Sequence, residues 1–335
     1  MSKSSLVLCV WCFALNVGGI FGQSLSAHAT SHSLTIWKDG DWATLEGQVR
    51  NISGSALVFE QAGAFGVKSI PFSMIRKFTF TSDPDFARGT SSFGTKNFES
   101  AQRHFEKALE SEGRAWAKPE ILVRIAESMI ADNRRHDAIG VFEQISRLVP
   151  DSRLLGRLPL VWDERLPEIE RLKLPIDQLT TGSDVRRLAI ASSVLHDPRH
   201  QRRAISVLKK LKVASDSSAI SHLATAQLWR LGLLDTTETV QMLTDVWEKQ
   251  WRRMPGSVRS GPGYVLGRCL QRQNEFDRAA LVLLWSPYVQ FHDRSLAAAG
   301  LRSAADCLTA AGRKSEAESV YRELLLQFSD QSSSK

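Results

Sequence analysis

The chain has 335 residues, of which 43% are hydrophobic and 24% are charged, and its formal net charge is +7. This composition excludes a disordered or fibrous protein, and the length suits about two domains. The excess of positive charge is local, because residues 184–212 hold eight Arg and Lys residues against two Asp residues.

The first 29 residues have the features of a cleaved signal peptide. Lys3 precedes an uncharged apolar stretch from Leu6 to Phe21, and Ala27-His28-Ala29 has the small-x-small form of a cleavage site. The apolar stretch is shorter than the roughly 20 residues that a membrane-spanning helix needs. We therefore expect a soluble protein that is periplasmic or secreted after cleavage near Ala29.

Residues 33–81 have the pattern of short β-strands. Hydrophobic residues recur with period two, and the segments KDGD, SGSA and AGAFG divide the pattern as turns do. Pro71 cannot lie in a central strand, so it predicts a short turn between Ile70 and Ile75. Four or five strands of this kind resemble a small SH3-like or Sm-like β-barrel.

A polar connector is expected over residues 82–95, and a helical pattern follows it. Asn133 is suited to end one helix, because Asn accepts the left-handed conformation of a C-terminal cap, and Ala138 is small enough for the next helix to pack closely. The same spacing recurs at Asn274 and Ala279, and at Gly312 and Ala317. A second helix with a small residue at the matching place, Ala101, precedes these repeats.

Further positions repeat at fixed offsets from these small residues. Small residues stand twelve positions earlier and bulky residues four positions later: Ala126, Gly267 and Ala305, then Phe142, Leu283 and Tyr321. This pattern resembles the tetratricopeptide (TPR) repeat, although the spacing between copies is longer than the usual 34 residues.

The sequence thus predicts an α+β fold that is mainly α, with a small N-terminal β-barrel-like domain followed by a TPR-like α–α solenoid. N-terminal repeats are expected over residues 96–152 and C-terminal repeats over residues 259–330. Residues 153–258 predict a divergent helical region, with helices over 183–195, 201–213, 217–231 and 236–252.

The two cysteines outside the signal peptide occupy the same place in two repeats. Cys269 and Cys307 each lie ten residues before the small residue of the second helix. Equivalent helices of neighbouring repeats are further apart than the ~7 Å between Cα atoms that a disulfide tolerates. The sequence therefore predicts two free, buried thiols.

Motifs of the common enzyme classes are absent from the sequence. There is no phosphate-binding Gly-rich loop ending in Lys-Ser or Lys-Thr, no HExxH and no GxSxG, and the one CxxC, at Cys9 and Cys12, lies inside the expected signal peptide. His196 and His200 have the spacing of metal ligands on a helix, but Pro198 between them breaks such a helix. We expect neither a metal nor a cofactor, and no catalytic residues are assigned.

The TPR resemblance implies a groove lined by the first helices of the repeats, which binds peptides or proteins. In the N-terminal repeat it would include Glu120, Val123 and Glu127. In the C-terminal repeats the partner-binding residues would be Tyr264, Arg268, Gln271, Arg272, Arg302 and Asp306, with Thr309 beside them. Arginines clamp carboxylates, so the expected partner is an acidic or C-terminal peptide.

The basic segment has two interpretations. Its second half is an amphipathic helix whose charged face is either simply solvated or binds an anionic partner, such as an acidic protein, a cell-wall polymer or a phospholipid surface. Nucleic acid is disfavoured because the protein is expected to be exported. The residues of this patch are Arg186, Arg187, Arg202, Arg203, Lys209 and Lys210.

The function favoured by these patterns is that of a non-catalytic, exported scaffold for protein–protein interaction. One alternative is a periplasmic enzyme with a site in the divergent central region. The other is a protein that binds an anionic cell-wall or membrane surface through the 186–212 patch.

Overall fold

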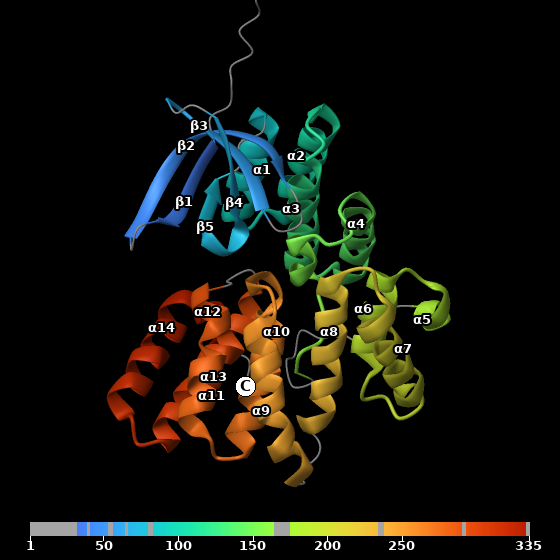
Figure 1. Ribbon diagram of the computed structural model, residues 1–335, viewed down its shortest axis with the longest axis vertical. Coiled ribbons are helices and arrows are strands. Elements are labelled where there is room, and N and C mark those ends of the chain that lie inside the picture. The colour runs from blue at the N-terminus through green and yellow to red at the C-terminus, as the bar shows by residue number, and fades with distance from the viewer. Residues whose placement is uncertain are drawn as a thin grey trace, which may run out of the picture.

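The computed structural model describes residues 32–38, 41–52, 56–63, 66–79, 83–163, 175–233, 238–289 and 293–332. Within them, one small antiparallel sheet is followed by helices, which confirms an α+β protein that is mainly α. Figure 1 shows the strands beside α1 and α2 at one end of the long axis, with the later helices towards the other. The expected signal peptide lies outside the described residues.

The sheet has five strands in the order β4-β3-β2-β1-β5, so the last strand returns to pair with the first. Leu34 and Ile36 of β1 and Leu57 and Phe59 of β3 form its core, as the period-two pattern predicts. The strand bounds are β1 (His32–Lys38), β2 (Asp41–Ile52), β3 (Ala56–Gln61), β4 (Val67–Pro71) and β5 (Ile75–Thr79).

Pro71 ends β4, and the 3₁₀-helix η1 (Phe72–Met74) connects it to β5. The short turn expected between Ile70 and Ile75 is therefore confirmed. β4 lies at an edge of the sheet, where the missing N–H of a proline costs no ladder hydrogen bond.

The remaining described residues are mostly helical. The helices are α1 (Pro84–Gly94), α2 (Phe98–Ser111), α3 (Lys118–Ala131), α4 (Arg135–Leu148), α5 (Gln178–Thr181), α6 (Asp184–Val194), α7 (Gln201–Ala214), α8 (Ser218–Trp229), α9 (Glu238–Arg253), α10 (Ser260–Arg272), α11 (Phe276–Leu283), α12 (Trp285–Val289), α13 (Arg294–Ala310) and α14 (Lys314–Ser332). Short 3₁₀ segments are η2 (Arg153–Arg157), η3 (Arg230–Leu233) and η4 (Gly256–Val258).

The connector expected over residues 82–95 is instead largely the helix α1. Asp83 caps it, because the Asp83 side chain accepts a hydrogen bond of 3.0 Å from the Phe86 N–H, and Pro84 occupies the first turn. The Gly, Ser and Thr content of this segment suggested a loop. The capping residues and the burial of Phe86 and Gly89 outweigh that composition.

Four residues in the left-handed conformation join pairs of helices. Asn133, Asn274 and Gly312 have φ of 59°, 62° and 79°, and they end α3, α10 and α13 as expected. Lys96, which the sequence analysis did not single out, has φ of 61° between α1 and α2. Each of the four stands five residues before a buried alanine of the following helix.

Two of these pairs pack closely at a small residue of the first helix. A Cβ added to Gly267 would lie 2.6 Å from Cγ of Leu283, and one added to Gly89 would lie 2.7 Å from the Phe105 ring. Gly89 stands twelve residues before Ala101, so α1 and α2 repeat the arrangement of the later pairs.

The helices expected in the central region are also present. α6, α7, α8 and α9 match the four predicted ranges to within two residues at each end. Ser183 and Ser217 act as N-caps, accepting hydrogen bonds from the N–H groups of Arg186 and Ile220. α7 packs against both α6 and α8.

The sheet is joined to the helices around a buried histidine. His32 is 2% exposed and meets the ring of Trp116 edge-on, at 5.7 Å between centroids. Arg114 lies 3.3 Å from His32 Nε2 and is also bound to Glu112. Burial, together with the charge of Arg114, lowers the pKa of His32 to about 4, so this ring is neutral at pH 7.

Candidate partner-binding site

The residues predicted to bind a partner lie on α10 and α13, which are neighbours in the structure. Arg268 joins the two helices, because its Nη1 donates a hydrogen bond of 3.0 Å to Oγ of Ser303. Arg272 on α10 and Arg302 on α13 are exposed to solvent. We call the surface formed by Arg268, Gln271, Arg272, Arg302, Asp306 and Thr309 the α10/α13 face.

Two polar atoms on this face are buried and make no hydrogen bond. They are Nε of Arg268 and Oε1 of Gln271. Buried polar groups in proteins are nearly always paired, so an unpaired donor and acceptor one helical turn apart require an explanation. A donor and an acceptor together are what a peptide group can satisfy.

Asp306 is held in place by a neighbouring helix. The hydroxyl of Tyr321 on α14 donates a hydrogen bond to the Asp306 carboxylate, and this bond raises the pKa of Tyr321 to about 12. Tyr321 was expected only as a bulky packing residue, so its polar contact was missed. The α10/α13 face therefore carries fixed negative charge as well as arginines.

Tyr264 does not belong to this face, which corrects the sequence-based expectation. Its side chain is 3% exposed, and its hydroxyl donates a hydrogen bond of 2.7 Å to Oδ2 of Asp163. The helical position predicted for Tyr264 is correct, but the chain itself covers that part of α10. Tyr264 therefore anchors a segment of its own chain and is not free to contact a partner.

The covering segment is residues 153–163. Its apolar side chains are buried, and Trp162 lies so close to α10 that a Cβ on Gly261 would be 1.9 Å from the indole ring. Val161 exchanges hydrogen bonds with side chains: its N–H donates to Ser192 Oγ at 2.9 Å, and its carbonyl accepts from Gln227 Nε2 at 3.1 Å. Side chains of α6 and α8 thus bind the backbone of Val161.

A buried arginine supports this arrangement. Arg230 is 1% exposed and donates hydrogen bonds to the carbonyl of Ser192 at 2.8 Å and to Oε1 of Gln227 at 2.6 Å. It thereby fixes the two residues that hold Val161. None of these three side chains was singled out from the sequence, because each binds a residue 31 to 66 positions away.

The same segment covers the N-terminal part of the expected groove. Glu120 and Glu127 of α3 pair with Arg153 and Arg157 of η2 at 2.6 and 2.5 Å. Val123 between them is buried. The two glutamates expected to face a partner therefore face residues 153–157 of the chain, and none of the three residues is exposed.

The basic patch divides into a paired part and an unpaired part. On α6, Arg186 donates to Glu143 at 3.0 Å through Nε, and Arg187 is paired with Asp184. These two arginines are therefore neutralised. The basic patch is not continuous, which corrects the expectation from the sequence. The cations of α7, namely Arg202, Arg203, Lys209 and Lys210, are exposed.

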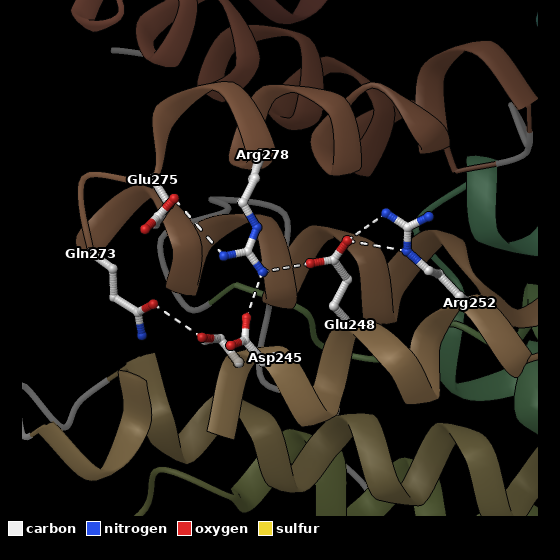
Figure 2. Close-up of polar contacts among 7 residues, drawn as sticks. Asp245, Glu248, Arg252, Gln273, Glu275 and Arg278 are labelled. Atoms are coloured by element: carbon white, nitrogen blue, oxygen red, sulfur yellow. Dashed lines mark hydrogen bonds and ion pairs between the residues drawn. The ribbon is translucent and has the colours of Figure 1, made fainter. Parts of the chain in front are cut away.

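A second polar cluster joins helices α9 and α11 (Figure 2). Arg278 of α11 reaches Asp245 and Glu248 of α9, each at 2.7 Å, and Arg252 also binds Glu248 at 2.6 Å. The hydrogen bond from Arg278 is the largest of the effects that lower the pKa of Glu248. Every charge labelled in Figure 2 has an opposite charge beside it, so this cluster is a surface cross-link between helices.

The remaining expectations about chemistry concern cysteine and metal ligands. Cys269 and Cys307 are free and buried, as predicted. No group of three or more His, Cys, Asp or Glu side chains in the described part of the chain is arranged to hold a metal ion. Among the same residues, no helix combines the length and the apolar character needed to span a bilayer.

Comparison with known proteins gives no assignment. No protein-family model matches this chain, and no curated protein sequence is similar to it.

Proposed function

We propose that the helices form a TPR-like α–α array and that the protein is a non-catalytic, exported scaffold that binds an acidic peptide at the α10/α13 face. The repeated joint supports the array. A residue in the left-handed backbone conformation stands five positions before a buried alanine at four places: Lys96, Asn133, Asn274 and Gly312. Stacked helix pairs of one design leave the first helices of neighbouring pairs side by side, as α10 and α13 are.

The observation that carries the proposal is the pair of unsatisfied polar atoms beside exposed arginines. Once their side chains shift towards solvent, Arg268 Nε can donate to, and Gln271 Oε1 can accept from, a group outside the chain, and the exposed Arg272 and Arg302 supply positive charge around them. An extended peptide offers N–H and C=O groups to the first pair and carboxylates to the second.

The way in which the central helices bind the segment 153–163 favours a scaffold over an enzyme. In the central region Ser192 and Gln227 hold Val161 of the chain itself by hydrogen bonds, and Arg230 fixes these two residues. Side chains of this array therefore already bind backbone groups in one place, and the α10/α13 face offers polar groups of the same kind to a second, external segment.

The sheet is proposed to be a small SH3-like or Sm-like domain that serves as a second docking module or as an N-terminal cap of the array. Its antiparallel order, with β5 returning to pair with β1, supports a barrel-like arrangement. Contact of His32 with Trp116, in the loop before α3, favours the role of a cap.

The test is binding of a fluorescently labelled, Glu-rich decapeptide with a free carboxyl terminus, measured by anisotropy. Arg272→Gln with Arg302→Gln is expected to weaken binding at least tenfold, since exposed arginines attract the carboxylates. The matched control removes two charges elsewhere, with Lys209→Gln and Lys210→Gln, and is expected to change the affinity less than threefold. Equal losses in the two double variants would show attraction to net charge only and would overturn the proposal.

A further inference from the structure

Helix α7 presents a cationic side that the proposed function does not use. Ala204, Val207, Leu208 and Leu211 are buried against the neighbouring helices. The opposite side is exposed to solvent, and Figure 1 shows α7 near the right-hand edge of the molecule. We call the exposed residues Arg202, Arg203, Lys209, Lys210, Lys212 and Val213 the α7 face.

Among the described residues, no acid is paired with a cation of the α7 face. The helix contains no Asp or Glu. In the part of the chain that the structure describes, none of its five cations forms an ion pair, whereas the nearby Arg186, Arg187 and Arg199 are each paired with a carboxylate. The excess charge of the basic segment is therefore concentrated on one side of one helix.

An apolar side chain lies on the same side. Val213 is 83% exposed, and it follows Lys209 and Lys210 by four and three residues, so it shares their face of the helix. Ser206 stands between Arg202 and Lys210 along the same row. From residue 202 to residue 213 the row is about 16 Å long, at 1.5 Å per residue.

We propose that the α7 face docks the protein on the anionic phospholipid headgroups of a membrane surface. Five unpaired cations complement a surface of closely spaced phosphates, and long Lys and Arg side chains reach them without a fixed geometry. Val213 can enter the boundary between headgroups and acyl chains, because the aliphatic parts of the neighbouring lysines lie beside it while their charged ends stay at the phosphates. Lysine is depleted in protein–protein interfaces relative to the rest of the surface, so a face with three lysines suits an acidic protein less well.

The mode of attachment follows from the burial of the other side of α7. Because Ala204, Val207, Leu208 and Leu211 already pack in the protein core, the helix cannot turn its apolar side into the bilayer. Docking is therefore peripheral and electrostatic. It weakens as ionic strength rises, since salt screens interactions between exposed charges.

The test compares partition of the full chain onto vesicles of phosphatidylglycerol mixed with phosphatidylcholine and onto vesicles of phosphatidylcholine alone. The ratio of the two partition constants isolates the effect of lipid charge, because any apolar attachment contributes to both. Each cation near an anionic surface contributes about fivefold to partition. Lys209→Gln with Lys210→Gln is therefore expected to lower the ratio about 25-fold.

The control double variant, Arg272→Gln with Arg302→Gln, has the same net charge and is expected to leave the ratio within about threefold of that of the unmodified chain. Circular dichroism and thermal unfolding verify that both variants are folded. A ratio near one for the unmodified chain, or equal losses in the two double variants, would overturn the proposal. Binding of the Glu-rich decapeptide that is lost with the lysines, without a lipid preference, would assign the face to an acidic protein and equally overturn it.

This inference is independent of the α10/α13 face. The two double variants are used in both experiments with opposite expectations, so failure of one proposal leaves the result for the other intact.

Discussion

Gly89 offers a direct test of how closely α1 and α2 pack, because its helix was not expected from the sequence. Gly89→Ala adds a Cβ that would lie 2.7 Å from both Cδ1 and Cε1 of Phe105. Carbon atoms pack at about 3.5–4.0 Å, so the ring has to move by about 1 Å. Phe105 is 1% exposed and its ring contacts that of Phe86, so it cannot move without disturbing the core.

Gly140 is the matched control. It lies in the interior of α4, and a Cβ added there meets nothing within 4 Å. Gly140→Ala is expected to stabilise the protein by about 0.5–1 kcal/mol, because alanine is the better helix former. In Gly89→Ala the same increase in helix preference is opposed by overpacking, which lowers the free energy of unfolding by about 1–3 kcal/mol. The difference between the two variants in the free energy of unfolding therefore isolates the packing cost.

Urea unfolding followed by far-ultraviolet circular dichroism measures both variants. We expect a lower midpoint for Gly89→Ala and a higher one for Gly140→Ala, with unchanged slopes. Adding Phe105→Leu should recover part of the loss only in the Gly89→Ala background, with a coupling above about 0.5 kcal/mol. If Gly89→Ala stabilises the protein as much as Gly140→Ala does, α1 and α2 do not approach each other closely at Gly89.

Three further outcomes follow from buried groups. Burial raises the pKa of the Cys269 and Cys307 thiols to about 12 and about 11, so a maleimide should label neither in the native protein and both after denaturation without reductant; unlabelled thiols after denaturation would indicate a disulfide. Tyr264→Phe leaves the Asp163 carboxylate without its 2.7 Å partner and should cost about 1–3 kcal/mol in unfolding free energy, a loss that an unchanged urea midpoint would contradict. His32 stays neutral in the folded protein down to about pH 4, but in the unfolded chain it binds a proton below about pH 6.5. Its contribution to stability is therefore complete above pH 6.5, and as the pH falls from 6.5 to 4 the free energy of unfolding drops by about 1.4 kcal/mol per pH unit. His32→Gln should flatten the measured pH dependence of stability in this range.

Features that depend on neighbouring residues were predictable from the sequence. The cap conformations of Asn133, Asn274 and Gly312, the helices of the central region and the turn after Pro71 all follow from local preferences. Helix α1 was missed because its Gly, Ser and Thr content favours a loop, while its cap at Asp83 is a single residue.

Contacts between distant segments were not predictable in this way. Repeat spacing places Tyr264 correctly on α10, but nothing near it in the sequence indicates that Asp163, 101 residues away, lies against it. The pairing of Arg186 with Glu143 is of the same kind, at a separation of 43 residues. The candidate site was therefore predicted as a set of helix faces, and the structure was needed to determine which of them are open.

The buried segment 153–163 has a consequence for how the protein is made. Synthesis proceeds from the N-terminus, so this segment is complete about 100 residues before α10 exists to cover Trp162 and Tyr264 is available to bind Asp163. Until then the side of Trp162 that packs against α10 has no cover. An ordinary array of repeats can gain or lose a unit without great cost. In this chain, loss or gain of a unit between the segment and α10 would separate two surfaces that must meet, so the number of helices between them is fixed by the fold.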